Sequence, residues 1–181
     1  QRVGGEGAHL AARNCLEAAV EREPDYVDGL AWLGQMYIEE YWADLNPRSE
    51  GLPSLAAALA VLNRALILDP NHQMVRHALA YAYYMKGNLG EFRLQAKKAL
   101  SINPNNNQTF AEVAWMTAYS GEWDRGLELF FQLEDKGATI PAWLNGVPFL
   151  YYYRLGEYSR ALDYGRNFLE LSRWPYSIRL A

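Results

Sequence analysis

The feature that most constrains this chain is a pattern that recurs every 34 residues. Pro70 and Pro104 stand 34 positions apart, and so do Gly87 and Gly121. Four further pairs keep the same step: Ala65 with Ala99, Leu66 with Leu100, Leu79 with Val113, and Ala80 with Ala114. This period is typical of arrays of stacked helical hairpins. The recurrence therefore predicts an all-α fold.

Apolar residues at i, i+3 and i+4 spacing predict the helices, and proline and glycine mark the turns between them. We expect a glycine-rich loop over 1–7 and one unpaired helix in a half repeat over 8–24. Four hairpins and a tail should follow, over 27–70, 73–104, 107–138, 141–172 and 173–181. Pro24 and Pro70 stand 46 positions apart, twelve more than one period, which predicts an insertion at about 42–53. The prediction is a single domain over 1–181 with about nine helices and no strands.

Single residues refine these boundaries. Ser54 is the expected N-cap of the next helix, and the small Gly34 should let a neighbouring helix approach closely. Gly137 is the expected C-terminal glycine of its helix. Pro141 fits a first helical turn, whereas Pro148 lies inside a helical pattern and should kink it.

Composition and charge exclude several classes of protein. The formal net charge is −4, which argues against nucleic-acid binding because that function needs a clustered basic face. No apolar run reaches the roughly 18–20 residues of a membrane span. The single Cys15 cannot form an internal disulfide, which suits a reducing, cytoplasmic location. We expect it to be a small packed side chain. Because the chain begins with Gln1 rather than Met, we expect it to be a piece of a longer protein.

The sequence shows no arrangement typical of catalysis or cofactor binding. The three histidines, His9, His72 and His77, have no carboxylate or cysteine at metal-ligand spacing, so we expect exposed or capping roles. Glu39 and Glu40 are adjacent acids, for which a solvated helix face is the expected setting. No nucleophile arrangement and no glycine-rich phosphate loop is present. We therefore predict no catalytic residue, no metal and no cofactor, and hence no enzyme.

The recurring residues resemble the tetratricopeptide repeat. That family places Leu-Gly and Tyr on the first helix of each hairpin, Ala and an aromatic or Leu on the second, and Pro at the end. The matches in the first hairpin are Leu30, Leu33, Gly34, Tyr37, Ala58, Leu62, Ala65 and Pro70. The second hairpin matches at Leu79, Ala80, Tyr83, Phe92, Ala96, Ala99 and Pro104, and the later two match more loosely. The resemblance implies a right-handed α-α superhelix whose first helices line a concave groove.

The resemblance also implies which residues face a ligand. In the first hairpin these positions are Asp28, Ala31, Gln35, Ile38 and Glu39. In the later hairpins the candidate groove consists of His77, Tyr81, Tyr84, Met85, Trp115, Tyr119, Leu150 and Tyr153. Tyr and Trp carry much of the binding energy at interfaces, and Met adapts to irregular shapes. The alternative is that these rings pack on each other or on a neighbouring repeat.

The family's best-known ligand mode clamps a C-terminal carboxylate with Lys, Arg and Asn. The matched positions here hold His77, Tyr81 and Trp115, which argues against an adaptor for chaperone tails. The insertion resembles arrays at the C-terminal end of bacterial signalling proteins that carry a cyclase or winged-helix domain elsewhere.

The sequence thus predicts a non-catalytic module that binds a protein or peptide partner in an aromatic groove, as the regulatory part of a larger bacterial protein. One alternative is a homo-oligomerisation domain, a homodimer through terminal helices that uses Tyr151–Tyr153 and Trp174. Another is a small-molecule sensor that uses the same groove.

Overall fold

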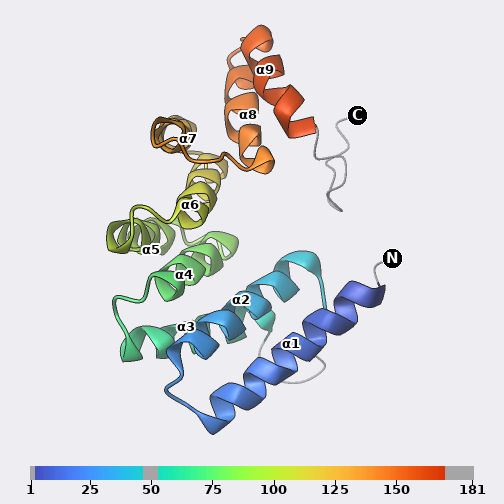
Figure 1. Cartoon of the computed structure of the whole chain (residues 1–181), viewed down its shortest axis with the longest axis vertical. Helices are drawn as coiled ribbons and strands as arrows, with labels where there is room; N and C mark the ends of the chain where they lie inside the picture. Colours follow the sequence, from blue (N-terminus) through green and yellow to red (C-terminus); the bar gives the residue numbers. More distant parts are fainter. Residues whose placement is uncertain (1–2, 47–52, 170–181) are drawn as a thin grey trace. The chain divides into compact units, whose positions relative to one another are not determined.

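The computed structural model describes residues 3–46 and 53–169, and this part of the chain is helical without strands (Figure 1). Its α-helices are α1 (Val3–Arg22), α2 (Val27–Ala43), α3 (Ser54–Leu68), α4 (Gln73–Met85), α5 (Leu89–Ile102), α6 (Asn107–Tyr119), α7 (Trp123–Asp135), α8 (Gly146–Arg154) and α9 (Tyr158–Leu169). A 3-10 helix, η1 (Ala142–Asn145), leads directly into α8. These nine α-helices confirm the predicted all-α fold class. The predicted tail over 173–181, with Trp174, and the centre of the insertion lie outside the described residues.

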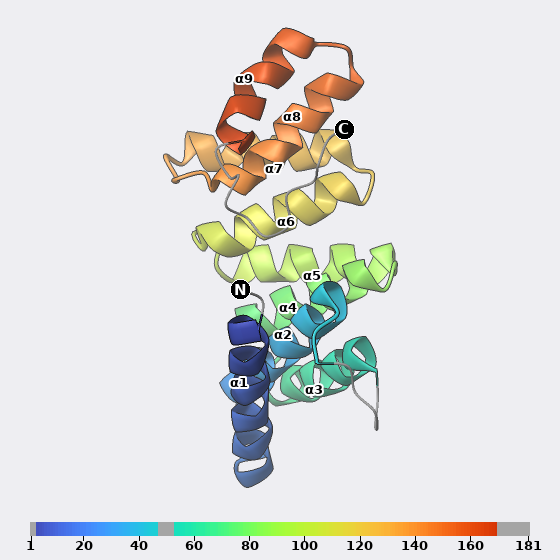
Figure 2. The same cartoon turned by 90° about the vertical axis from the view of Figure 1, so that its right-hand side faces the viewer.

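The helices fall into two compact units, Gln1–Asn103 and Pro104–Ala181. In the first unit, α2 packs on α3 and α4 packs on α5, while α1 lies against α2. Its core is made of residues on the predicted apolar stripes, such as Leu30, Leu62 and Leu79, each 0% exposed. In the second unit, α6 packs on α7 and α8 lies beside α9 (Figure 2).

Glycine closes the tight turns of the hairpins. Gly87, Gly121 and Gly156 adopt φ values of +75°, +102° and +76°, a left-handed conformation that glycine adopts without a steric penalty. Gly137 has φ +66° and donates its N–H to the carbonyl of Glu134 at 2.8 Å, which confirms its predicted place at a helix C-terminus. The predicted close approach at Gly34 is also confirmed, because an added Cβ would lie 2.4 Å from Cγ of Leu62.

Two expectations for the N-terminal helix are wrong. Helix α1 begins at Val3 rather than after a loop over 1–7, since each glycine costs only about 1 kcal/mol in a helix and does not forbid one. Cys15 is exposed rather than packed. The side of α1 that reaches the core carries Leu16 and Val20, and Cys15 lies off that stripe.

The predicted N-cap at Ser54 and the predicted kink at Pro148 also need correction. Ser54 is the first residue of α3, after Pro53, and its hydroxyl donates to Oε2 of Glu40 at 3.4 Å instead of capping the helix. Pro148 does not kink a continuous helix, because the segment starts as η1 and becomes α-helical at Gly146. Pro148 is therefore in the first turn of α8, where backbone N–H groups need no intrahelical partner.

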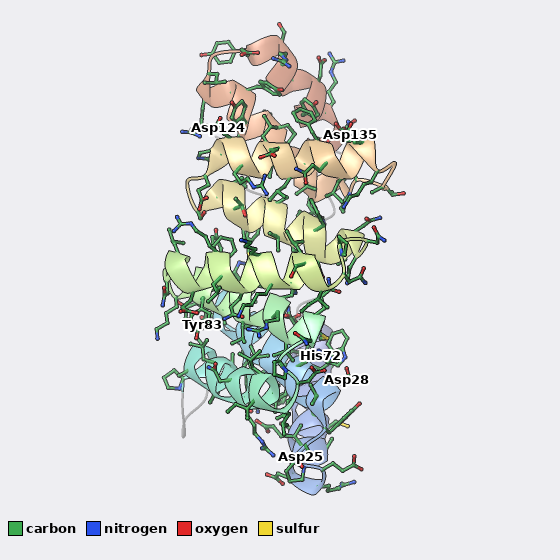
Figure 3. All side chains as sticks on the ribbon, turned by 90° about the vertical axis from the view of Figure 1, so that its left-hand side faces the viewer. Asp25, Asp28, His72, Tyr83, Asp124 and Asp135 are labelled. Atoms are coloured by element: carbon green, nitrogen blue, oxygen red, sulfur yellow. The ribbon has the colours of Figure 1, made fainter. Side chains whose placement is uncertain are left out.

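His72 links two hairpins of the first unit, in the capping role that the sequence suggested. Its Nδ1 accepts from the N–H of Val75 at 3.4 Å, and its Nε2 lies 3.0 Å from Oδ1 of Asp28 (Figure 3). Since Nδ1 is the acceptor, Nε2 carries the proton and donates to the carboxylate.

Candidate functional site

Helix α4 carries the candidate groove residues of the first unit. His77, Tyr81, Tyr84 and Met85 are spaced at i, i+4, i+7 and i+8, which places them on one side of the helix. His77 is only 9% exposed, so it offers little surface, whereas the other three are half-buried. The ring of Tyr84 lies 5.7 Å from that of Phe92, and burial raises the pKa of the Tyr84 phenol. Tyr81 packs against the core of this unit.

In the second unit, the candidate residues on α6 form part of a continuous run of rings. Trp115 and Tyr119 have ring centroids 5.3 Å apart, and Tyr119 lies 5.3 Å from Trp123 at the start of α7. The guanidinium of Arg154, the last residue of α8, lies 4.7 Å from the centre of the Trp123 ring. We call Trp115, Tyr119, Trp123 and Arg154 the aromatic run. It joins side chains from three helices.

The remaining two candidates lie on α8. Leu150 is half-buried, and Tyr153 is 56% exposed. The ring of Tyr153 contacts Phe149 at 6.2 Å and Tyr158 at 5.6 Å. The structure therefore keeps most of the candidate side chains partly accessible, but many of the rings also pack on each other.

The aromatic run ends at a pocket of about 490 Å³ between the α6–α7 turn, the start of α7 and the end of α8. This volume is within the usual range of ligand pockets. The lining residues are Gly121, Glu122, Trp123, Asp124, Arg125, Tyr151, Arg154 and Leu155. They combine an aromatic face with two cationic and two acidic side chains, so the pocket suits a group with both apolar and polar parts.

Tyr151 and Asp124 fix one wall of this pocket. The Tyr151 hydroxyl donates to Oδ1 of Asp124 at 2.8 Å. This hydrogen bond raises the pKa of the Tyr151 phenol, because ionisation would break the bond and place a second negative charge beside the carboxylate. The phenol thus stays neutral and keeps donating near neutral pH.

Trp123 is not among the candidate groove residues, because the 34-residue step aligns it with Leu89, two positions after a turn glycine. The structure makes it the centre of the aromatic run. The available signal was its residue type, since a tryptophan two positions after a turn glycine is far larger than the turn requires.

Several ligand-facing positions implied by the family resemblance are not accessible. Ala31 and Ile38 on α2 are 0% exposed and belong to the core of the first unit. Asp28 is exposed, and Gln35 and Glu39 are half-buried. The expected surface on α2 is therefore reduced to three polar side chains.

A second polar cluster surrounds Glu40 in the first unit, and here the prediction of a solvated acid is wrong. The Glu40 side chain is 0% exposed, whereas that of Glu39 is 43% exposed. Oε1 of Glu40 accepts from Nη1 of Arg13 at 2.9 Å and from Nδ2 of Asn46 at 3.2 Å. Nδ1 of His9 lies 4.0 Å from the same oxygen.

A hydrogen bond and an ion pair also hold the neighbouring turn of α1. The Tyr37 hydroxyl donates to Oε1 of Glu17 at 2.6 Å, and Nε of Arg13 lies 3.8 Å from that oxygen. These contacts hold α1 on α2. Among residues 3–46 and 53–169, no three His, Cys, Asp or Glu side chains come together as metal ligands. No helix of this part is long and apolar enough to span a membrane.

Stacked helical hairpins of this kind define an all-α repeat protein. A family model described as "Tetratricopeptide repeat" matches residues 54–107, which include α3, α4 and α5. A search among curated proteins found no match.

Several solved structures share the fold. One described as MamA superposes with a TM-score of 0.66 at 17% identity, over 93% of this chain and 91% of the other. PilW, described as a widely conserved type IV pilus biogenesis factor, superposes with a TM-score of 0.69 at 17% identity, over 96% of this chain and 80% of PilW. A tetratricopeptide repeat protein from Parabacteroides merdae ATCC 43184 superposes with a TM-score of 0.71 at 16% identity, over 92% of this chain and 60% of the other. Residues 54–107 thus match the tetratricopeptide-repeat family, and the chain shares the fold of these solved structures.

Proposed function

We propose that this chain is a non-catalytic module that binds a peptide or protein segment through the aromatic run of the second unit. The tetratricopeptide-repeat fold supports a protein-interaction scaffold in general. The observation that supports the finer proposal is that the rings of Trp115, Tyr119 and Trp123 lead to a pocket lined by Trp123 and Arg154. Rings of this kind contribute most of the binding energy at many interfaces.

The residues that line the pocket indicate which chemical groups a partner would place in it. A side chain with an apolar body could lie against Trp123, and a polar end could reach Arg154 or the Asp124–Tyr151 pair. The α4 residues Tyr81, Tyr84 and Met85 provide a second accessible surface in the first unit. That this module regulates a larger bacterial signalling protein in the cytoplasm stays a prediction from the sequence.

The test starts from peptides selected from a random library on the intact protein. Affinities of the selected peptides are then measured by calorimetry for Trp115→Ala and for Trp123→Ala. We expect each variant to weaken binding by roughly thirtyfold or more, the loss typical of a central interface residue.

The matched control is Trp32→Ala, because Trp32 is also a helix tryptophan and is 51% exposed on α2. It should leave the affinity unchanged. Equal losses in all three variants, or no loss at Trp115 and Trp123, would show that the aromatic run is not the binding surface. Circular dichroism confirms that each variant stays folded.

A further inference from the structure

Helix α9 presents an exposed stripe that the proposed binding surface does not use. Tyr158, Leu162 and Arg166 are spaced by four residues, so they follow one side of the helix. Tyr158 is 62% exposed and Leu162 is 58% exposed, and Arg166 is exposed as well. We call these three residues the α9 stripe. Large apolar side chains exposed side by side often mark an interaction surface.

The preceding hairpin shows what normally covers such a stripe. A step of 35 residues relates the turn glycines Gly121 and Gly156, and the same step relates Leu127 to Leu162. Leu127 is only 8% exposed, because Tyr152 and Ala161 of the following hairpin pack on it. Leu162, its counterpart, is exposed among the described residues.

The residue that corresponds to Tyr158 in the preceding hairpin is likewise covered by a side chain of the following hairpin. The 35-residue step relates it to Trp123, and the guanidinium of Arg154 covers the Trp123 ring at 4.7 Å. A helix that covers the α9 stripe in the same manner would place an apolar side chain on Leu162 and a guanidinium on Tyr158.

The α9 stripe itself carries both groups in the required order. If two copies of α9 pack antiparallel about a two-fold axis at Leu162, residues at equal distances from Leu162 face each other. Leu162 then meets Leu162 of the other copy, and Tyr158 meets Arg166, four residues to the other side. The two-fold axis produces each Tyr–Arg contact twice, as in any interface that uses the same patch on both subunits.

We propose that the α9 stripe is a self-association surface that joins two copies of this chain. The contact combines leucine burial at the centre with cation–π pairs at both ends. Because one helix face is a small interface, the dimer should be weak, with a dissociation constant on the order of micromolar or higher. This surface is separate from the aromatic run, so the two proposals can fail independently.

Oligomeric state is measured by light scattering on the full chain, up to several hundred micromolar. We expect the average mass to rise from one chain to two as the concentration increases. Leu162→Glu should weaken dimerisation by roughly thirtyfold or more, because it places two like charges at the centre of the interface. The matched control is Ile67→Glu on α3, since Ile67 is 82% exposed and lies in the first unit. It should have no effect.

A cross-link tests the geometry directly. In a Cys15→Ser background, which removes the chain's one native cysteine, Leu162→Cys should form an intermolecular disulfide under mild oxidation much faster than Ile67→Cys. A mass of one chain at all concentrations overturns the proposal, whether the stripe is free or covered by another part of the same chain. Equal cross-linking of the two cysteine variants also overturns it. Peptide binding by Leu162→Glu should remain unchanged.

Discussion

At the scale of single residues, Glu39 and Glu40 show how strongly position decides the role of a side chain. They are neighbours of identical chemistry, yet only Glu40 is buried and paired with Arg13. Removing Glu40 takes away the closer carboxylate of Arg13 and leaves only Glu17, at 3.8 Å, to compensate a largely buried charge. We predict that Glu40→Ala lowers the free energy of unfolding by about 3–5 kcal/mol. Urea unfolding followed by circular dichroism measures the loss.

Glu39→Ala is the matched control and should change that free energy by at most about 1 kcal/mol, as for an exposed ion pair. Similar losses in both variants would mean that the Glu40–Arg13 pair does not stabilise the docking of α1. The sequence held one signal for Glu40, because it follows Leu33 and Tyr37 at i+7 and i+3 and so continues the buried stripe of α2. Its partner Arg13 is 27 positions away, and no local pattern indicates a contact over that distance.

At the scale of helices, close packing inside the hairpins depends on particular glycines. A Cβ on Gly126 of α7 would lie 2.7 Å from the backbone N and Cα of Ala118 on α6, and a backbone cannot yield as a flexible side chain can. We predict that Gly126→Ala destabilises the protein by about 1–3 kcal/mol, the usual cost of overpacking. Thermal unfolding measures the change.

The control for Gly126 is Gly90 in α5, where the nearest atom to an added Cβ is Oδ1 of Asn88 at 3.8 Å. Gly90→Ala should stabilise the helix by up to about 1 kcal/mol, because alanine is the better helix former. A loss at Gly90 as large as that at Gly126 would contradict the steric explanation.

The helices themselves could largely be predicted, since periodic apolar residues and turn glycines mark them directly. Two ends could not. The start of α1 lies in a glycine-rich stretch without an apolar repeat, so no local pattern marks it as helical. The change from η1 to α8 at Gly146 depends on local backbone geometry that Pro148 alone did not reveal.

At the scale of the whole molecule, the fold class followed from the 34-residue recurrence, because stacked hairpins repeat the same interior contacts. The candidate site was harder to predict. The repeat pattern indicated which helix faces carry Trp115 and Tyr119, but the pocket also needs Trp123 and Arg154, which come from different hairpins. Their contact depends on how α8 packs on α7, and a one-dimensional pattern does not contain that information.

The division at Asn103 and Pro104 leads to the last prediction. Repeats of this kind depend mainly on their own interior and on adjacent repeats, so each unit can be tested as a fragment. The first unit keeps α1 and two hairpins around one core, while the second keeps two hairpins, one of which contains the nine-residue α8. Arrays need about three repeats for stability. We therefore expect Gln1–Asn103 alone to fold and unfold cooperatively on heating, and Pro104–Ala181 alone to unfold at a clearly lower temperature. Circular dichroism of both fragments, compared with the intact chain, tests this order. A second unit more stable than the first would show that neither the docked α1 nor hairpin number decides stability here.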